Sequence, residues 1–463
     1  MIETTTATGP GSMPARELVI PEPSLVLLVG VSGSGKSTFA ARHFGPTEVL
    51  SSDFFRGLVA DDESDQRASG DAFEVLYQVA RKRLAAGLLT VVDATNVHPD
   101  ARAEAVELAR EHDLPAVAIV LDLPLPLCLD RNAGRSDRVI EPRVLRNQRD
   151  TFRRGVPGLL GEGFHTIHRL TAAEQVDQAR VVRTRLPCDL RHETGPFDVV
   201  GDVHGCRDEL ETLLATLGYL LERDQAARPV AARHPDRRRV VFVGDLVDRG
   251  PDTAGVLRLV IGMVAAGDAL AVLGNHEHKL LRALRGQATR VGPAVAGALA
   301  QLDGESPEFR ALVERFLAGL VPHYVLDDGS LVVAHAGLPE RMHGRLSDRV
   351  REICLYGQAT GETDGYGRPV RYPWAREYRG KATVVYGHTP IPIPAFVNNT
   401  ICLDTGCVFG GRLTALRYPE RELVAVPAVR VYHPSVRPFP VNPEAARPAD
   451  PTPGEHGPAG RSR

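Results

Sequence analysis

The chain has 463 residues, of which 43% are hydrophobic and 24% are charged, a composition that excludes wholesale disorder and collagen-like order. Its apolar runs are too short for a membrane span and its first residues lack a signal peptide's features, so we expect a cytoplasmic protein. The formal net charge of −3 provides no global basic field for nucleic acid. The six cysteines contain no CxxC pair and are interpreted as reduced thiols, not as a disulfide framework or a zinc site.

The N-terminal part of the chain alternates short apolar strands with helices. Residues 1–23 are predicted to be a flexible N-terminus and residues 24–170 a P-loop kinase domain. Strands are expected at Leu25–Val29, Leu88–Val92 and Ala116–Leu121. Buried strands that alternate with helices indicate a doubly wound parallel sheet of the α/β class, with helices on both faces.

A phosphate-binding loop follows the first strand. Residues 30–37 read GVSGSGKS and match the pattern GxxxxGK[ST] in full. Glycines let backbone N–H groups surround phosphate oxygens, and the next helix directs its positive end at the same anion. Lys36 is predicted to reach the β- and γ-phosphates of ATP, and Ser37 to hold Mg²⁺. The residues expected to bind ATP in this loop are Gly30, Gly33, Gly35, Lys36, Ser37 and Thr38.

Charged side chains beyond the loop indicate phosphoryl transfer. Asp53 follows a short strand and can accept a proton from an attacking hydroxyl, and the alternative is that it caps a helix. Asp93 ends a third strand, where it could lie near the metal. Arg131, Arg135 and Arg138 have the i, i+4, i+7 spacing of one helix face. We interpret these arginines as a lid over ATP, with a solvated basic face as the alternative.

A second strand-rich region follows a polar stretch. Residues 171–194 are predicted to be a linker, residues 195–431 a second domain, and the Pro-rich residues 432–463 a disordered tail. The strands expected in the second domain are Phe197–Val200, Val240–Val243, Ala269–Leu273, Leu331–Ala334, Thr383–Tyr386 and Ile401–Leu403.

Five motifs of the second domain each follow an apolar strand. They are GDVHG, GDLVDRG, GNHE, AHAG and GHTP, beginning at Gly201, Gly244, Gly274, Ala334 and Gly387. Carboxylate oxygens and imidazole nitrogens suit a pair of Mn²⁺-like ions, which would turn a water molecule into a nucleophile toward phosphorus. The expected metal ligands are Asp202, His204, Asp245, Asn275, His335 and His388, with Asp245 bridging both ions.

Three more side chains are assigned to catalysis. His276 adjoins the ligand Asn275 but is expected to point away from the metals, toward the leaving group, as a general acid. Asp248 would orient His276. Arg249 would bind the phosphate through two parallel hydrogen bonds from its guanidinium.

These motifs are similar to those of the binuclear metallophosphoesterase superfamily, in the branch of serine/threonine phosphatases and diadenosine tetraphosphatases. Together with the P-loop, SSDxxR and DRNxxR, they resemble bacterial polynucleotide kinase-phosphatases, RNA end-healing enzymes, over residues 24–430. The resemblance implies a calcineurin-like β-sandwich flanked by helices. It also implies that Asp53 is the general base for a 5′-hydroxyl, that Arg56 holds the acceptor's phosphate, and that Arg131 and Arg135 contact ATP. Asp404, in Leu-Asp-Thr-Gly, falls in a family motif without a derived role.

The leading hypothesis is an enzyme that heals nucleic-acid ends. It would phosphorylate 5′-hydroxyl ends with ATP and Mg²⁺, and remove 3′-phosphate or 2′,3′-cyclic phosphate with two divalent ions, expected to be Mn²⁺. RNA ends are the expected partner. No lysine has the KxDG pattern of a ligase, so a ligase or RNA-modifying protein would be a separate partner. RNA versus DNA preference stays open, as does a homodimer.

Two alternatives accompany this hypothesis. One is a small-molecule P-loop kinase fused to a diadenosine tetraphosphatase or a serine/threonine phosphatase, and the other is a non-enzymatic ATP sensor. Residues 351–379 combine aromatic side chains, among them Tyr356, Tyr366, Tyr372 and Trp374, with several arginines. They could stack exposed bases, or they could form a packed surface loop.

Overall fold

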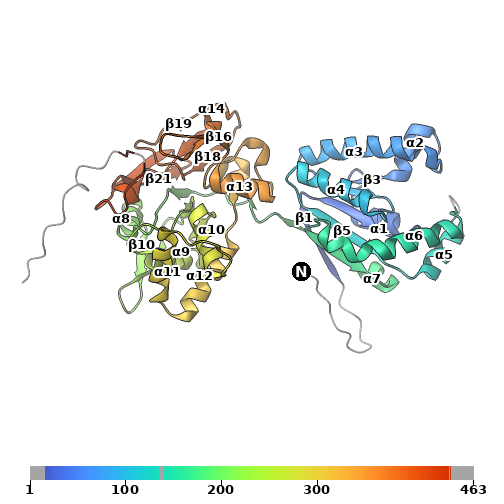
Figure 1. The fold of residues 1–463 in the computed structure, drawn as a ribbon, viewed down its shortest axis with the longest axis horizontal. Helices are drawn as coiled ribbons and strands as arrows, with labels where there is room; N and C mark the ends of the chain where they lie inside the picture. Colours follow the sequence, from blue (N-terminus) through green and yellow to red (C-terminus); the bar gives the residue numbers. More distant parts are fainter. Residues whose placement is uncertain (1–15, 136–138, 437, 440–463) are drawn as a thin grey trace, which may run out of the picture. The chain divides into compact units, whose positions relative to one another are not determined.

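The structure is a computed structural model, and it describes residues 16–135, 139–436 and 438–439. The chain forms two compact units (Figure 1). The first ends at Asp189 and also contains Gly344–Arg351, whereas the second contains Leu190–His343 and resumes at Glu352. Within the described residues, no helix combines the length and the apolar character that crossing a membrane requires.

The first unit is built on a five-stranded sheet with the order β3-β4-β2-β5-β6, in which neighbouring strands are parallel. Its strands are β2 (Leu25–Val29), β3 (Val49–Ser51), β4 (Thr90–Asp93), β5 (Ala116–Leu121) and β6 (Thr166–Leu170). Its helices are α1 (Lys36–His43), α2 (Ser52–Ala60), α3 (Ser69–Ala85), α4 (Pro99–Glu111), α5 (Leu125–Ala133), α6 (Pro142–Gly155) and α7 (Ala173–Gln178).

Every residue of the central strands β2 and β5 is buried. Uninterrupted apolar strands of this kind need cover on both faces of a sheet, and helices lie on both faces of this one (Figure 1). The predicted doubly wound parallel sheet is therefore confirmed. Because β2 lies between β4 and β5, the loop after β2 opens at a point where the strand order reverses, where such sheets bind ligands.

Two segments predicted to be irregular contain paired strands. In β1 (Glu17–Glu22), Leu18 and Ile20 are fully buried, and this strand pairs in parallel with β7 (Arg180–Arg185). The expected flexible N-terminus of residues 1–23 and the expected linker of residues 171–194 thus include β1, α7 and β7. The apolar residues of β1 and β7 form short runs between charged residues, so the sequence did not reveal these strands. Most of the predicted tail lies outside the described residues.

The second unit contains two mixed sheets, ordered β13-β12-β9-β21-β22 and β19-β20-β18-β15-β14-β8. The first sheet is formed by β9 (Phe197–Val200), β12 (Arg239–Phe242), β13 (Ala269–Ala271), β21 (Arg412–Tyr418) and β22 (Glu422–Pro427). The second is formed by β8 (Asp189–Leu190), β14 (His323–Leu326), β15 (Leu331–Ala334), β18 (Thr383–Tyr386), β19 (Phe396–Val397) and β20 (Thr400–Cys402). Two hairpins add β10 (Leu220–Arg223) with β11 (Pro229–Arg233), and β16 (Ala359–Thr363) with β17 (Pro369–Arg371).

Alternate residues of the first sheet face two different cores. Val199 and Val241 pack with residues of the second sheet, such as Val333, whereas Val200 and Phe242 pack with helix residues. This period of two produces a sandwich between the sheets and a helical layer outside, which confirms the predicted class. The helices of the unit are α8 (Arg207–Leu217), α9 (Thr253–Ala265), α10 (Asn275–Leu284), α11 (Pro293–Asp303), α12 (Pro307–Gly319) and α14 (Trp374–Glu377). A further helix, α13 (Asp348–Tyr356), begins in the segment assigned to the first unit and belongs to the second from Glu352 on.

Phe242→Ala should destabilise the second unit markedly. Phe242 is fully buried in the helical core, and truncating a buried phenylalanine costs about 3–5 kcal/mol through lost burial and a new cavity. Urea unfolding followed by the fluorescence of Trp374, the one tryptophan of the sequence, should show an earlier transition. Leu220→Ala, at a side chain that is 67% exposed, is the control and should leave the midpoint almost unchanged. Equal midpoints for the two variants would contradict this view of the core.

Candidate functional site

The polar side chains of the second unit gather where strands of both sheets end. Asp202 follows β9, Asp245 follows β12, His335 follows β15 and His388 follows β18, while Asn275 begins α10 just after β13. Several non-glycine residues of these loops have a positive φ: His204, Asp245, Asp248, Arg249 and His388. Such backbone strain persists only where the surrounding structure enforces it, and it concentrates at functional sites.

One group of acceptors converges on His335. Its Nε2 lies 2.9 Å from Oδ1 of Asn275 and 3.0 Å from Nδ1 of His388, and 3.4 Å from Oδ1 of Asp245. Its Nδ1 lies 3.0 Å from the carbonyl oxygen of Val243, to which it can donate. That bond leaves the lone pair of Nε2 directed at the other ligands, the orientation that a metal-binding histidine requires.

A second group shares Asp245 with the first. His204 Nε2 lies 3.5 Å from Oδ2 of Asp245, and His204 Nδ1 lies 2.9 Å from the carbonyl oxygen of Val247. Asp202 accepts a bond from the backbone N–H of His388, 3.1 Å from its Oδ2. The structure thus brings the six predicted metal ligands to one buried place. Asp245 belongs to both groups of His and Asp side chains whose ligand atoms lie within 4.8 Å of one another.

His276 is held by the two residues predicted to act with it. Its Nδ1 is 2.6 Å from Oδ2 of Asp248, and its Nε2 accepts from Nη2 of Arg249 at 3.0 Å. Arg249 also donates from Nη1 to Nε2 of His204 at 2.6 Å. The expectation that His276 points away from the metal ligands is wrong, because its Nε2 lies 4.0 Å from Oδ2 of Asp245. Asp248 and Arg249 together turn the ring toward the ligands.

The glycine-rich loop of the first unit encloses Lys36. Its Nζ donates to the carbonyl oxygens of Gly30 at 2.9 Å and Val31 at 3.0 Å. Burial lowers the pKa of Lys36 to about 8, partly opposed by the charge of Asp93. Asp93 accepts a hydrogen bond from Ser37, and burial raises the pKa of its carboxyl. The predicted phosphate-binding lysine, the predicted Mg²⁺ ligand and the Asp93 carboxylate are therefore neighbours.

Asp53 and Arg56 form an ion pair in the first turn of α2. Ser51, not Asp53, caps this helix, since the Ser51 side chain accepts from the N–H of Phe54. The alternative role of Asp53 as a helix cap is therefore wrong. Arg56 is buried and donates from Nε to the carbonyl oxygen of Glu63 at 2.8 Å.

The predicted arginine lid is only partly helical. Arg131 lies in α5, and its Nη1 lies so close to Gly35 that a Cβ added there would be 3.4 Å away. The helix ends at Ala133, with Gly134 as its C-cap residue, so Arg131 and Arg135 do not share a helix face as expected. The charge of Arg135 still reaches Lys36 and lowers its pKa. Arg138 lies outside the described residues.

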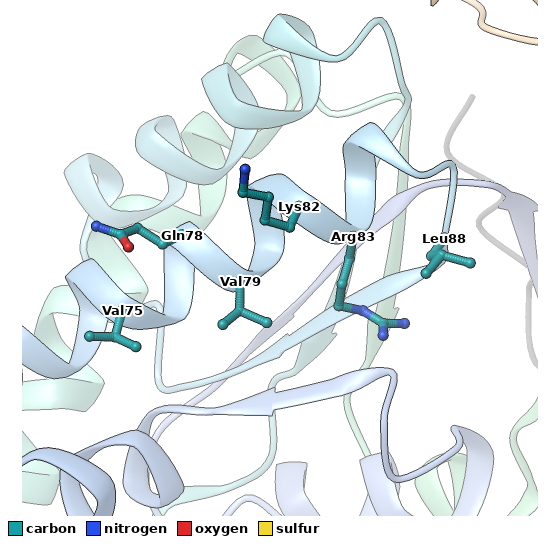
Figure 2. A pocket seen from close by; sticks show the side chains of 6 residues that line it. All are labelled: Val75, Gln78, Val79, Lys82, Arg83 and Leu88. Carbon is teal, nitrogen blue, oxygen red and sulfur yellow. The ribbon is translucent and has the colours of Figure 1, made fainter.

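A shallow hollow beside α3 is lined by residues other than those predicted to bind ATP or to take part in phosphate transfer. Figure 2 shows its lining, which includes Val75, Val79 and Leu88, with Lys82 and Arg83 beside them. Its volume is about 400 Å³. None of the predicted site residues lines it, so we assign it no part in catalysis.

The motifs and their geometry agree with comparisons to known proteins. Residues 195–422 match the calcineurin-like phosphoesterase family. Three relatives share the name bis(5′-nucleosyl)-tetraphosphatase PrpE [asymmetrical]. The protein of Anoxybacillus flavithermus is 43% identical over 240 residues, which are 51% of this chain and 96% of that protein. This chain belongs to the calcineurin-like phosphoesterase family.

The other two relatives agree with this assignment. The Bacillus subtilis protein is 44% identical over 240 residues, which are 51% of this chain and 96% of that protein. The Geobacillus thermodenitrificans protein is 43% identical over 236 residues, which are 50% of this chain and 94% of that protein. Residues 25–155 match the AAA domain family, so a P-loop domain precedes the calcineurin-like phosphoesterase domain.

The buried donors of this calcineurin-like phosphoesterase fit divalent metal ions. Burial, then the charges of Asp404 and Asp245, raise the pKa of Asp202 well above its usual range. Burial also raises the pKa of Asp404 to about 7. Carboxylates crowded in a buried site need a cation to stay ionised, and an oxygen and imidazole donor set suits a divalent one. Asp202, His204 and Asp245 would hold one ion, and Asp245, Asn275, His335 and His388 the other.

Two further residues support the calcineurin-like centre. Glu277 accepts the N–H groups of Asp245 and Leu246 at 2.8 Å each and that of Gly274 at 3.0 Å, and burial raises its pKa to about 8. It thereby fixes the loop that carries the shared ligand. Its position in the GNHE motif was a signal that our sequence reasoning left unused. Arg371, at the end of β17, places Nη2 3.3 Å from Nε2 of His388. It is one of the arginines of residues 351–379, but the sequence did not place it beside the metal ligands.

Removing divalent ions should weaken the second unit. Without cations, Asp202, Asp245 and Asp404 repel one another in a buried site, and ligands that bind only the folded state stabilise it by mass action. Dialysis against a chelator should therefore lower the melting temperature read from Trp374 fluorescence, and added Mn²⁺ should restore it. Unchanged melting after verified metal removal would contradict the assignment of a metal centre.

Proposed function

We propose that the chain is a bifunctional enzyme that heals polynucleotide ends. In this proposal the first unit transfers the γ-phosphate of ATP to a 5′-hydroxyl end, with Mg²⁺. The second unit removes 3′-phosphate or 2′,3′-cyclic phosphate, with two divalent ions, expected to be Mn²⁺. The observation that carries the proposal is the fusion of the phosphoesterase centre to a P-loop site whose sheet also positions the Asp53–Arg56 pair. RNA ends are the proposed partner, and a separate ligase would complete repair.

In the proposed phosphate transfer, four polar side chains of the first unit have separate roles. β3 and β2 belong to one parallel sheet, so Asp53 and the glycine-rich loop follow strand ends at the same edge. Asp53 would accept the proton of the attacking hydroxyl as it attacks phosphorus. Arg56 would leave Asp53 to hold a phosphate of the acceptor strand. Lys36 and Arg131 would stabilise the charge on the transferred group, and Mg²⁺ would neutralise part of the charge of ATP when bound.

The hydrolytic half depends on the His276 cluster. When bound, the metal pair supplies polarisation of the phosphate and a lowered pKa of water. Arg249 can grip two phosphate oxygens, since its guanidinium already spans His204 and His276. Asp248 accepts from Nδ1 of His276 and fixes the ring. Once Arg249 turns from His276 to the phosphate, Nε2 of His276 would be free to take up a proton from solvent and to deliver it to the leaving oxygen.

A second candidate function is hydrolysis of dinucleoside polyphosphates alongside a small-molecule kinase. It is favoured by the names of the relatives, which cover half of this chain. The metal centre alone does not separate the candidates, because each substrate presents the same phosphate group. The difference must come from groups outside the metal ligands, such as Arg371 on the exposed hairpin.

A substrate comparison tests the proposal. The full chain is given a 5′-hydroxyl oligoribonucleotide or a nucleoside with labelled ATP, and separately a 3′-phosphate oligoribonucleotide or diadenosine tetraphosphate with Mn²⁺. End healing predicts labelling of the oligonucleotide in preference to the nucleoside, and phosphate release from the 3′ end. Labelling of the nucleoside with preferred cleavage of diadenosine tetraphosphate would favour the second candidate. Turnover of neither oligonucleotide would overturn end healing.

A further inference from the structure

A second cluster of metal-ligating side chains lies in the phosphoesterase unit, distinct from the catalytic ligands. Sγ of Cys206, Sγ of Cys407 and a carboxylate oxygen of Glu209 all lie within 4.8 Å of one another. The exposures of the three residues are 0%, 2% and 2%. Cys206 precedes α8, Glu209 lies in its first turn, and Cys407 follows β20 after a short loop. Segments far apart in the sequence therefore meet at this cluster.

Glu209 has one carboxylate oxygen that nothing in the described part of the chain satisfies. Its Oε1 accepts the backbone N–H of Val429 and the hydroxyl of Tyr432, each at 2.8 Å. Its Oε2 is buried and has no hydrogen-bond partner among the described residues. A buried carboxylate oxygen without a donor is costly. A cation beside the two sulfurs would remove that cost.

The two cysteines are free thiols in direct contact with each other. No described cysteine forms a disulfide, and the hydrogen bond with Cys206, together with burial, raises the pKa of Cys407 well above its usual range. Metal binding would release one proton from each thiol to the solvent as two sulfur–metal bonds form.

We propose that Cys206, Cys407 and Glu209 bind a zinc ion that is structural and separate from the catalytic metal pair. Two soft thiolates favour Zn²⁺, which also accepts a carboxylate oxygen as a ligand, whereas the oxygen and imidazole donors around Asp245 suit harder ions. The absence of a CxxC spacing hid the site, because its cysteines come from separate motifs. Cys206 lies two residues after His204, and Cys407 three residues after Asp404. The zinc ion would therefore tie together two loops of the catalytic centre.

Cobalt substitution tests the proposal without relying on activity. Full-length protein refolded with Co²⁺ should show a thiolate-to-cobalt charge-transfer band in the near ultraviolet. The band should be lost in Cys206→Ser and Cys407→Ser. It should persist in Cys128→Ser, a buried cysteine of the other unit, and in Asp245→Asn, which alters only the catalytic ligands. A wild-type protein without the band, or a band that survives both serine variants, would overturn the proposal.

X-ray absorption of the zinc-loaded wild type covers the case in which the serine variants fail to fold. Zinc in the proposed site should show sulfur neighbours at about 2.3 Å. Zinc with oxygen and nitrogen neighbours alone would overturn the proposal, because the metal would then occupy only the catalytic centre. Mass spectrometry of the unreduced protein provides a further check. A Cys206–Cys407 disulfide in the native protein as purified, before any metal is removed, would also overturn the proposal.

Discussion

Lys36→Ala should lower the rate of phosphate transfer from ATP by about 10²–10³-fold while leaving the phosphoesterase activity unchanged. The Lys36 ammonium is buried in the glycine-rich loop, where the carbonyl oxygens of Gly30 and Val31 hold it in place. It is thus pre-positioned for the phosphate charge that develops during transfer. Removing one such preorganised donor lowers a rate by about 10²–10³-fold. The measurement is labelling of a 5′-hydroxyl oligonucleotide, with release of phosphate from a 3′-phosphate oligonucleotide assayed on the same preparation.

Lys82→Ala is the matched control for this variant. Lys82 is one of the four lysines of the sequence and lies exposed on α3. Its removal subtracts the same charge from the same unit but leaves the phosphate loop intact, so labelling should stay within a small factor of wild type. Equal labelling by the Lys36 and Lys82 variants would refute the assignment of the glycine-rich loop as the ATP site.

Asp245→Asn should have the largest effect on the phosphoesterase. Asp245 is the side chain common to both groups of ligands, so one substitution weakens both metal positions. The lost charge stabilisation is several kcal/mol, which corresponds to a rate reduction of about 10³-fold or more. Asparagine tolerates the positive φ of 50° at this position, and the loop should keep its shape. The assays are phosphate release and bound divalent metal per chain.

The control for Asp245→Asn is Asp236→Asn, at an exposed loop position outside the ligand groups. It makes the same chemical change and should retain both metal and activity. Phosphate release by Asp245→Asn at the rate of this control, with folding verified by Trp374 fluorescence, would show that Asp245 does not bind the catalytic ions.

The strands that sequence reasoning predicted best are buried on both faces. Leu25–Val29, Ala116–Leu121 and Phe197–Val200 were predicted with the bounds that the structure shows, because an uninterrupted apolar run between polar loops marks such strands clearly. β21 was missed, since Arg412 and Arg417 leave only the four residues LTAL between them, too short an apolar run to stand out. The Arg417 guanidinium lies at the end of α8, where it donates to the carbonyl oxygen of Leu217 at 2.7 Å.

The site residues also divide into those that the sequence could assign and those whose role depends on tertiary contacts. Residues within a motif, such as Lys36 and His335, could be assigned from the sequence because the strand before them fixes where they lie. The role of Asp404 could not, since its raised pKa comes from burial in tertiary structure. Likewise, the contact between Cys206 and Cys407 depends on two loops meeting. Arg135 is a motif residue that the sequence placed wrongly. The expected lid required one helix to carry both Arg131 and Arg135, but α5 ends at Ala133.

We expect the exposed hairpin of β16 and β17 to influence which phosphate ester the phosphoesterase accepts. All five residues of β16 are exposed, yet Arg371 at the end of β17 reaches the edge of the ligand cluster. The two sheets hold the reactive centre rigidly and leave it little freedom to diversify. A short surface insertion has no such constraint. We therefore expect that exchanging a few exposed residues of the hairpin changes the choice of substrate while the buried metal ligands stay as they are.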